Sequence, residues 1–108
     1  MLENTQTQMR KGILEYCILS IISKREIYSS DIMEELKNAK LLVVEGTLYP
    51  LLTRLKNNNL LVYNWVESLT GPPRKYYKLS DKGKETLLQL DKTWQELLYA
   101  VNTLNSNE

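Results

Sequence analysis

Residue types that bind phosphates and base edges gather at the start of one predicted helix, within the segment Glu45–Leu61. Gly46 permits a close approach of the backbone, and the hydroxyls of Thr47 and Tyr49 suit bonds to phosphates or base edges. The backbone N–H groups at a helix start also attract anions. Together with Pro50, these residues make a compact polar end that suits entry into a DNA groove.

A second segment with related chemistry follows at Asn64–Gly83. Its composition is typical of a β-hairpin whose tip is stiffened by Pro72 and Pro73 and made basic by Arg74 and Lys75. A groove-entering helix beside a basic hairpin is the arrangement of a winged helix. The two segments therefore predict a winged helix-turn-helix protein with double-stranded DNA as its partner.

Catalytic chemistry has little support in the composition. The chain has no histidine, which removes the commonest general base, and one cysteine, Cys17. A zinc site or a Cys–His nucleophile is thereby excluded. Cys17 lies in an apolar helical stretch, where the ordinary role is that of a small buried side chain. We predict that the protein is not an enzyme and has no catalytic residue, metal site or cofactor.

The positive charge lies where the DNA chemistry lies, although the formal net charge is only +1. Residues 43–79 carry five basic against two acidic side chains, whereas residues 1–42 are balanced. Residues 80–108 carry three basic against five acidic side chains. This distribution favours nucleic acid binding. A solvated basic face without function is the alternative.

The length of 108 residues allows a single core. No apolar run approaches the ~20 residues that span a bilayer. The segment MLENTQTQMRKG at the N-terminus lacks the apolar stretch of a signal peptide. We expect a cytoplasmic protein without a membrane partner.

Apolar periodicity predicts two helices before the groove-entering one. The first should run from Asn4 or Thr5 to about residue 23, and its wide apolar arc should pack on two sides. The second should begin at Ser29 or Ser30, which are N-cap types, and end near residue 40. Leu41–Val44 is β-branched and apolar, and could form a short strand.

The third helix has leucines at helical spacing and contains a proline that limits where it starts. A proline deep in a helix costs ~3 kcal/mol, so Pro50 favours a start with Thr47 as N-cap. A start nearer Glu45 would require an irregular first turn. Asn57–Asn59 should end the helix, because asparagine tolerates the left-handed conformation.

The remaining pattern predicts two strands and a long final helix. Alternation indicates strands over residues 61–66 and 75–79, and Ser80 should cap the last helix. Apolar residues of that helix then recur at a/d heptad spacing. We call this set the seam: Leu87, Leu90, Trp94, Leu97, Val101 and Leu104.

The seam predicts a homodimer interface. Each leucine-sized side chain contributes about 1.5–3 kcal/mol when buried, and association costs on the order of 4–15 kcal/mol, so this surface is sufficient. The alternative is that the helix folds back on its own domain. The expected fold is mainly α with a small β-hairpin (α+β), with a DNA-binding domain at residues 1–80 and a dimerisation helix at 81–108. The first helix would be shared with the dimer interface.

These motifs resemble the PadR-type transcriptional regulators over nearly the whole chain. The resemblance lies in the N-terminal helix and in the segments Ile27–Leu36, Glu45–Leu55 and Arg74–Gly83. The string Gly-Thr-Leu-Tyr-Pro, followed by Arg-Lys-Tyr-Tyr and a Ser-led helix, is a specific combination. The closest similarity is to the short subfamily with a single C-terminal helix.

The resemblance implies a homodimeric repressor on a pseudo-palindromic operator. Carried over by position, the DNA-binding residues would be Tyr28, Ser29, Ser30, Gly46, Thr47, Tyr49, Pro50, Arg74 and Lys75. The chain departs from the common pattern at Ser30, Asn59 and Pro73, where the family often has tyrosine, glycine and arginine. A winged-helix module that binds other proteins without binding DNA is the alternative function.

The resemblance also implies a ligand. Some short, multidrug-binding members carry a tryptophan in the last helix that stacks on planar compounds at the dimer interface. Trp94 matches that position, and Tyr16 of the first helix could line the same cavity. A planar aromatic effector would then release the repressor from DNA. The alternative is a plain interface tryptophan.

Overall fold

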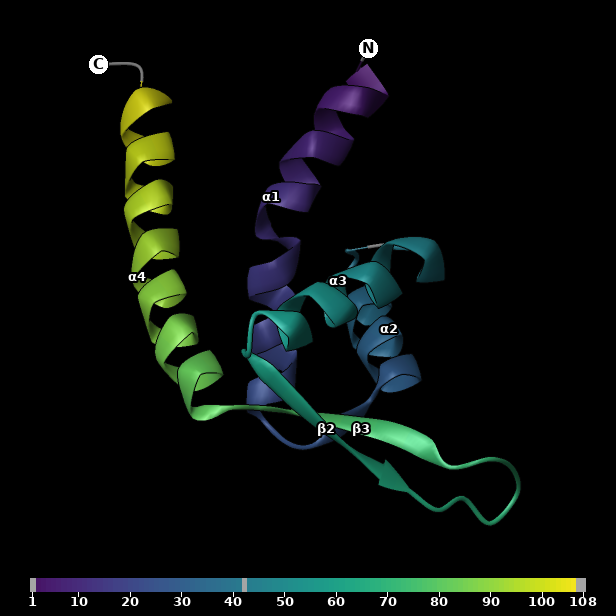
Figure 1. The fold of residues 1–108 in the computed structure, drawn as a ribbon. Helices are drawn as coiled ribbons and strands as arrows, with labels where there is room; N and C mark the ends of the chain where they lie inside the picture. The colour runs from purple at the N-terminus through teal and green to yellow at the C-terminus, as the bar shows by residue number, and fades with distance from the viewer. Residues whose placement is uncertain (1, 42, 107–108) are drawn as a thin grey trace.

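The chain is mainly helical with one three-stranded antiparallel sheet, in a computed structural model that describes residues 2–41 and 43–106. The predicted winged helix-turn-helix fold with a long C-terminal helix is confirmed (Figure 1). The elements are α1 (Leu2–Ser23), β1 (Ile27–Tyr28), α2 (Ser29–Asn38), α3 (Glu45–Asn57), β2 (Leu61–Val66), β3 (Arg74–Leu79) and α4 (Asp81–Leu104).

The sheet has one strand more than the predicted hairpin. Strands β2 and β3 pair antiparallel from Leu61 with Leu79 to Val66 with Arg74. The two residues of β1 add to the free side of β3, with Ile27 opposite Tyr77. A two-residue strand is too short to produce an alternating pattern, so the sequence did not predict it. We call the β2–β3 hairpin, with its turn, the wing.

The core lies between the second half of α1, helices α2 and α3, and one face of the sheet. Each helix and strand presents one apolar face to this core, through helical spacing in the helices and alternation in the strands. No side chain of α4 within the described residues is fully buried in this core. The buried apolar residues are Leu14, Ile18, Leu19, Ile22, Ile27, Ile32, Leu36, Leu48, Leu52, Leu55, Leu61, Tyr77 and Leu79.

Helix α3 begins earlier than predicted. Its N-cap is Val44, which makes no side-chain cap bond, and Pro50 is inside the helix. The prediction of Thr47 as N-cap is therefore wrong. The first turn carries a short-range bond from the Thr47 N–H to the Val44 carbonyl, at 2.9 Å. Pro50 has no N–H, so it cannot donate a helical hydrogen bond to the Gly46 carbonyl. Because Gly46 and Pro50 are both exposed, water can donate to this carbonyl instead.

Two other predicted helix starts and one possible strand need correction. Helix α1 starts at Leu2, so neither Asn4 nor Thr5 caps it. Helix α2 has Tyr28 as its N-cap, and Ser29 is its first residue. Leu41, Val43 and Val44 form no strand, and Leu42 lies outside the described residues.

Two helices end in left-handed residues, and one of them was predicted. Asn59 follows α3 with φ 66°, and the Leu60 N–H bonds the Leu55 carbonyl at 3.0 Å. Lys40 follows α2 with φ 68°, and the same pairing joins Leu41 to Leu36. Asparagine tolerates this conformation, whereas lysine gives no sequence signal for it.

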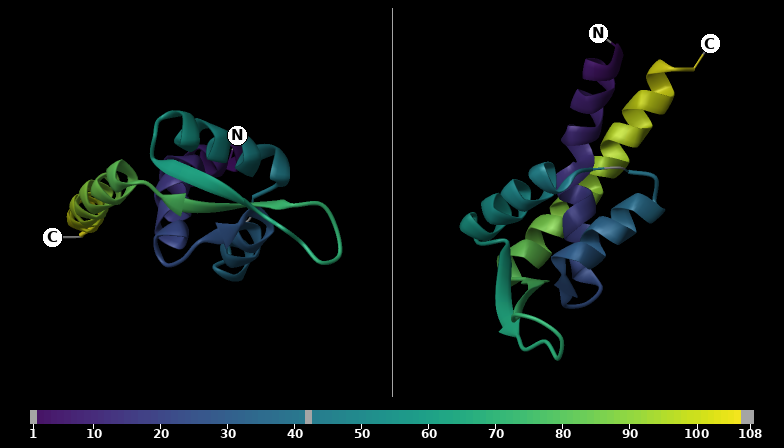
Figure 2. Two further views of the ribbon diagram at one scale, coloured as in Figure 1. Left: turned by 60° about the horizontal axis from the view of Figure 1, so that its bottom comes forward. Right: turned by 90° about the vertical axis from the view of Figure 1, so that its right-hand side faces the viewer.

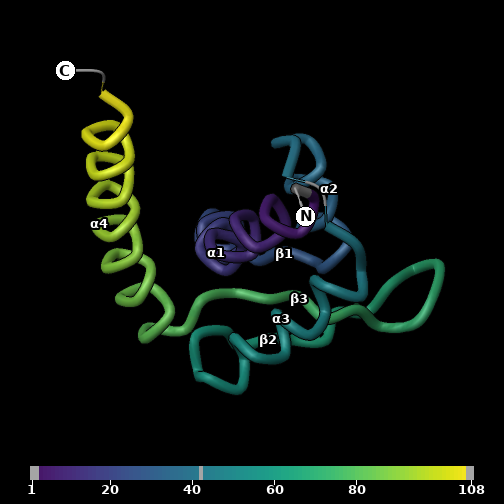
Figure 3. The backbone as a smooth tube through the Cα atoms, turned by 90° about the horizontal axis from the view of Figure 1, so that it is seen from above, coloured from purple at the N-terminus to yellow at the C-terminus, as the bar shows by residue number. Residues whose placement is uncertain are grey.

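Helix α4 leaves the wing at a tight junction. The Ser80 side chain accepts a bond from the Gly83 N–H at 2.9 Å, which confirms the predicted cap. A Cβ atom at Gly83 would lie 2.0 Å from the Leu60 carbonyl oxygen, so only glycine fits here. The free ends of α1 and α4 project to the same side of the molecule (Figure 2). Seen from above, the wing tip and α4 lie at opposite ends (Figure 3).

Candidate nucleic-acid interface

The start of α3 presents an open polar surface. Leu48 of this turn is fully buried and anchors it in the core, whereas Gly46 and Pro50 are exposed and Thr47 is half-buried. Tyr49 is 42% exposed. A Cβ atom at Gly46 would meet no atom within 4 Å, so nothing within the described chain requires glycine there.

The start of α2 lies against this surface and supports it. Ser29 is only 6% exposed, and its hydroxyl lies 3.3 Å from the hydroxyl of Tyr49. Ser30, the next residue, is exposed. The two serines predicted to lie near phosphates therefore have different surroundings: one contacts the Tyr49 phenol and the other faces solvent.

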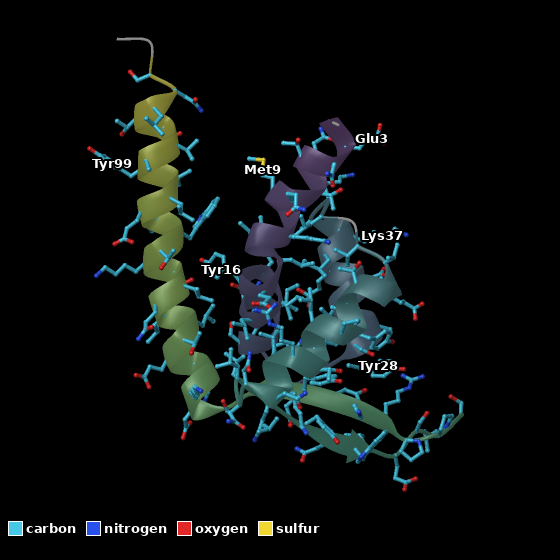
Figure 4. The ribbon with its side chains drawn as sticks, turned by 45° about the horizontal axis from the view of Figure 1, so that its top comes forward. Glu3, Met9, Tyr16, Tyr28, Lys37 and Tyr99 are labelled. Atoms are coloured by element: carbon cyan, nitrogen blue, oxygen red, sulfur yellow. The ribbon has the colours of Figure 1, made fainter. Side chains whose placement is uncertain are left out.

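The wing joins the same surface through Tyr28. The Arg74 guanidinium lies 4.7 Å from the centroid of the Tyr28 ring, and the Tyr76 ring lies 5.8 Å from it. Figure 4 shows Tyr28 at the start of α2, beside the wing. A cation over an aromatic ring is stabilised by the ring quadrupole, so this contact holds the Arg74 guanidinium against the start of α2.

Lys75 lies on the other face of the wing, because successive strand residues point to opposite faces. Its ammonium group is 4.5 Å from the Tyr63 ring centroid and 5.4 Å from that of Trp65. Trp65 is 61% exposed. The adjacent cations Arg74 and Lys75, predicted as one pair, therefore serve two separate surfaces.

Two basic residues lie in the second half of α3, and their surroundings differ. Arg54 pairs with Glu15 of α1 at 3.3 Å. Lys56 instead reaches the wing, with its ammonium group 5.7 Å from the Tyr63 ring. The sequence could not indicate this contact, because it joins residues of a helix and a strand.

The predicted ligand residues on α1 and α4 are adjacent. The Tyr16 and Trp94 ring centroids are 6.5 Å apart, tilted by 38°. The Tyr16 hydroxyl donates a 2.6 Å bond to Asp91 Oδ1. This bond, with a smaller contribution from burial, raises the pKa of Tyr16 to about 12. Tyr16 points from α1 toward α4 (Figure 4).

The seam is divided into two halves. Leu87 and Leu90 pack against the core, and Trp94 is half-buried. Leu97, Val101 and Leu104 are 51%, 49% and 83% exposed. The alternative that α4 folds back on its own domain therefore applies only to its first half.

The described part of the chain gives no support for a metal site, a membrane-spanning helix or a nucleophilic thiol. Residues 2–41 and 43–106 contain no group of three or more side chains able to hold a metal ion. No helix among them is long and apolar enough to cross a membrane. Cys17 is half-buried, and burial raises the pKa of its thiol, which disfavours the nucleophilic thiolate.

Comparison with known proteins identifies close structural relatives. A PadR-like transcription factor from Bacteroides fragilis is 59% identical, with a TM-score of 0.79, over 94% of this chain and 98% of that one. A PadR-like transcriptional regulator from Bacillus cereus is 40% identical, with a TM-score of 0.82, over 94% and 99%. Both are short chains like this one.

A further similar structure is that of Bacillus subtilis PadR in complex with operator DNA. It is 26% identical, with a TM-score of 0.66, and the match covers 72% of this chain and 46% of that one. The model of the transcriptional regulator PadR-like family matches residues 18–89. That range includes the last six residues of α1, all of α2, α3 and the wing, and the start of α4. The chain belongs to the PadR-like family of transcriptional regulators, which are not enzymes.

Proposed function

We propose that the protein is a homodimeric repressor that binds a pseudo-palindromic operator, with α3 as the reading helix in the major groove. The observation that carries this proposal is a continuous surface across three elements. Tyr49 of α3 contacts Ser29 of α2, and the neighbouring Tyr28 contacts Arg74 of the wing. The Bacillus subtilis relative, solved with operator DNA, supports a DNA partner.

Each residue of this surface has a proposed role. Gly46, Thr47, Tyr49 and Pro50 would face the base edges, because they form the open end of α3. Ser29 would orient the Tyr49 phenol rather than touch DNA, because it is buried beneath that contact. The residues assigned to phosphates are Tyr28, Ser30, Arg74 and Lys75.

The dimer would form through the exposed half of the seam. Leu97, Val101 and Leu104 leave an apolar stripe that water does not favour. Met9 of the projecting half of α1 is likewise 79% exposed. We assign residues 1–80 to the DNA-binding domain and residues 81–108 to the dimerisation helix, of which 107 and 108 lie outside the described residues.

A planar aromatic effector would bind at the dimer axis beside Trp94 and Tyr16. The two rings already lie near one another at the point where α4 leaves the core. A flat compound could stack on the indole of each protomer. Its binding would change the spacing of the two reading helices and so release the operator.

Selection of bound sequences from random DNA tests the DNA proposal. A two-fold dimer should enrich an inverted repeat whose half-sites lie about one helical turn, ~34 Å, apart. The enriched duplex should be retarded by the protein in a gel. Failure to enrich any sequence would contradict DNA binding and favour the protein-interaction module.

The variant Gly46→Ala separates binding from folding. Alanine should stabilise the helix by about 0.5–1 kcal/mol, because the added Cβ meets open space. Affinity for the selected duplex should nevertheless fall, because the methyl group prevents close approach of the backbone to DNA. A raised melting temperature with unchanged affinity would remove Gly46 from the interface.

Fluorescence of Trp94 tests the effector. In a Trp65→Phe background, planar dyes should quench Trp94 and weaken the binding of the selected duplex. A Trp94→Leu variant in the same background should bind the dye less, and the dye should no longer weaken its binding to the selected duplex. Absence of quenching at micromolar dye would identify Trp94 as a plain interface residue.

A further inference from the structure

We propose that Lys56 of α3 and Lys75 of the wing hold the phosphodiester backbone of DNA in a pocket between the two elements. This site rests on the proposed DNA-binding function. It joins Lys75, which is already assigned to a phosphate, with Lys56, which the family motif does not assign. Its ligand is an anionic phosphodiester group. Sequence-specific reading would remain with the start of α3.

The two ammonium groups approach one aromatic ring from different elements. Lys56 lies 5.7 Å and Lys75 lies 4.5 Å from the centroid of Tyr63. Both lysines line one pocket of about 110 Å³, together with Leu52, Thr53, Asn57, Tyr63 and Tyr77. The Thr53 hydroxyl and the Asn57 amide add donors suited to phosphate oxygens. The pocket therefore combines charge with hydrogen-bond donors.

No carboxylate within the described residues neutralises these two lysines. The ion pairs found there join Arg25 to Glu35 and Arg54 to Glu15. The face of Tyr63 only weakly attracts a cation, by about 0.5–1 kcal/mol at an exposed site. Both ammonium groups consequently keep most of their capacity to bind an anion.

In the proposed complex, the DNA backbone would pass this pocket. The major and minor grooves of a duplex are separated by a sugar–phosphate strand. A protein with α3 in the major groove and the wing beside the neighbouring minor groove must straddle that strand. Lys56 and Lys75 line the space between these two elements, where the phosphates would pass.

The dipole of helix α3 opposes the binding of an anion at this site. The C-terminal end of α3 carries a partial negative charge equivalent to about −0.5, which repels an anion. Lys56 lies in the last turn of the helix and offsets it, and Lys75 adds a second full positive charge. The sum of about +1.5 remains attractive to a phosphate.

The salt dependence of DNA binding tests the site. The selected duplex is titrated with the unchanged protein and with Lys56→Gln, Lys75→Gln and Lys78→Gln at several salt concentrations. Each lost phosphate contact should reduce the slope of log affinity against log salt by about 0.9. We expect this reduction for Lys56→Gln and Lys75→Gln. Lys78→Gln is the matched control, because Lys78 is on the same strand as Lys75 but lines a different pocket, which contains the acidic residues Glu26 and Asp81.

The experiment distinguishes failure of the phosphate site from failure of the proposed DNA-binding function. Thermal melting should show Lys56→Gln folded, because Lys56 is exposed. A Lys56→Gln slope equal to that of Lys78→Gln, with the unchanged protein still binding, would overturn the phosphate site alone. Absence of binding by the unchanged protein would overturn both this site and the proposed function.

Discussion

Helices α3 and α4 carry leucines at similar spacing, but the surroundings of these side chains differ. Leu48, Leu52 and Leu55 of α3 are at most 1% exposed. Leu97 and Leu104 of α4 are 51% and 83% exposed. The apolar face of α3 is covered by its own chain, whereas the second half of α4 has no such cover within the described residues.

The difference separates two kinds of stability. Burial of the α3 face belongs to the fold and is independent of protein concentration. Coverage of the α4 face requires a second molecule, so its contribution depends on concentration. The same apolar spacing therefore supports the core in one helix and, as proposed, assembly in the other.

The largest effect is expected in α3. Leu52→Ala should lower the free energy of unfolding by about 2–5 kcal/mol, because a fully buried leucine leaves both lost burial and a cavity. Chemical denaturation followed by circular dichroism measures this loss. The loss should be the same at high and low protein concentration, and a concentration-dependent loss would contradict the distinction between the two helices.

A smaller effect is expected at the joint between the core and α4. Gly83→Ala should cost about 1–3 kcal/mol, because the added Cβ would collide with the Leu60 carbonyl oxygen. Thermal melting measures the loss, and Gly12→Ala, which meets open space in α1, is the matched control. Equal melting temperatures for the two variants would show that the junction tolerates a side chain.

The contact between α1 and α4 should contribute less. Tyr16→Phe removes the hydrogen bond to Asp91 and should cost about 0.5–1.5 kcal/mol. Because the folded pKa of about 12 exceeds the ordinary value of 10, this contribution is full below pH 10 and is lost as pH rises toward 12. Absorbance titration should show one tyrosine ionising near pH 12 that is missing in Tyr16→Phe. An unchanged titration would rule out this bond.

The smallest effect on the fold is expected at Leu97. Leu97→Ala should change the unfolding free energy by no more than about 0.5 kcal/mol at dilutions where the chain is monomeric. At higher concentration it should weaken association, measured by sedimentation. Tyr99→Ala is the control, because Tyr99 is 75% exposed and outside the seam. Equal association of the two variants would contradict the proposed interface.

Local patterns in the sequence were sufficient to predict most of the elements. The wing strands, the Ser80 cap and the left-handed Asn59 follow from alternation, capping chemistry and backbone preference. These signals depend on residues that are close in the chain, so they can be recognised without knowledge of the tertiary packing. The family motif likewise identified the PadR-like regulators, whose model matches residues 18–89.

The start of α3 shows where a local rule was insufficient. Pro50 favoured a start at Thr47, yet the helix extends back to Glu45. The buried Leu48 fixes the first turns against the core, while exposure of Pro50 leaves the missing hydrogen bond to solvent. The local cost of Pro50 was therefore not enough to place the start of the helix.

The sequence by itself determined the helices, the wing, the charge distribution and the family. Only the tertiary structure decided which side chains meet: Ser29 with Tyr49, Arg74 with Tyr28, and Lys56 with Lys75 around Tyr63. These contacts join residues far apart in the chain, and their geometry depends on how a helix packs against a sheet. Periodicity specifies which face of an element is buried, but not which residue of another element it will contact.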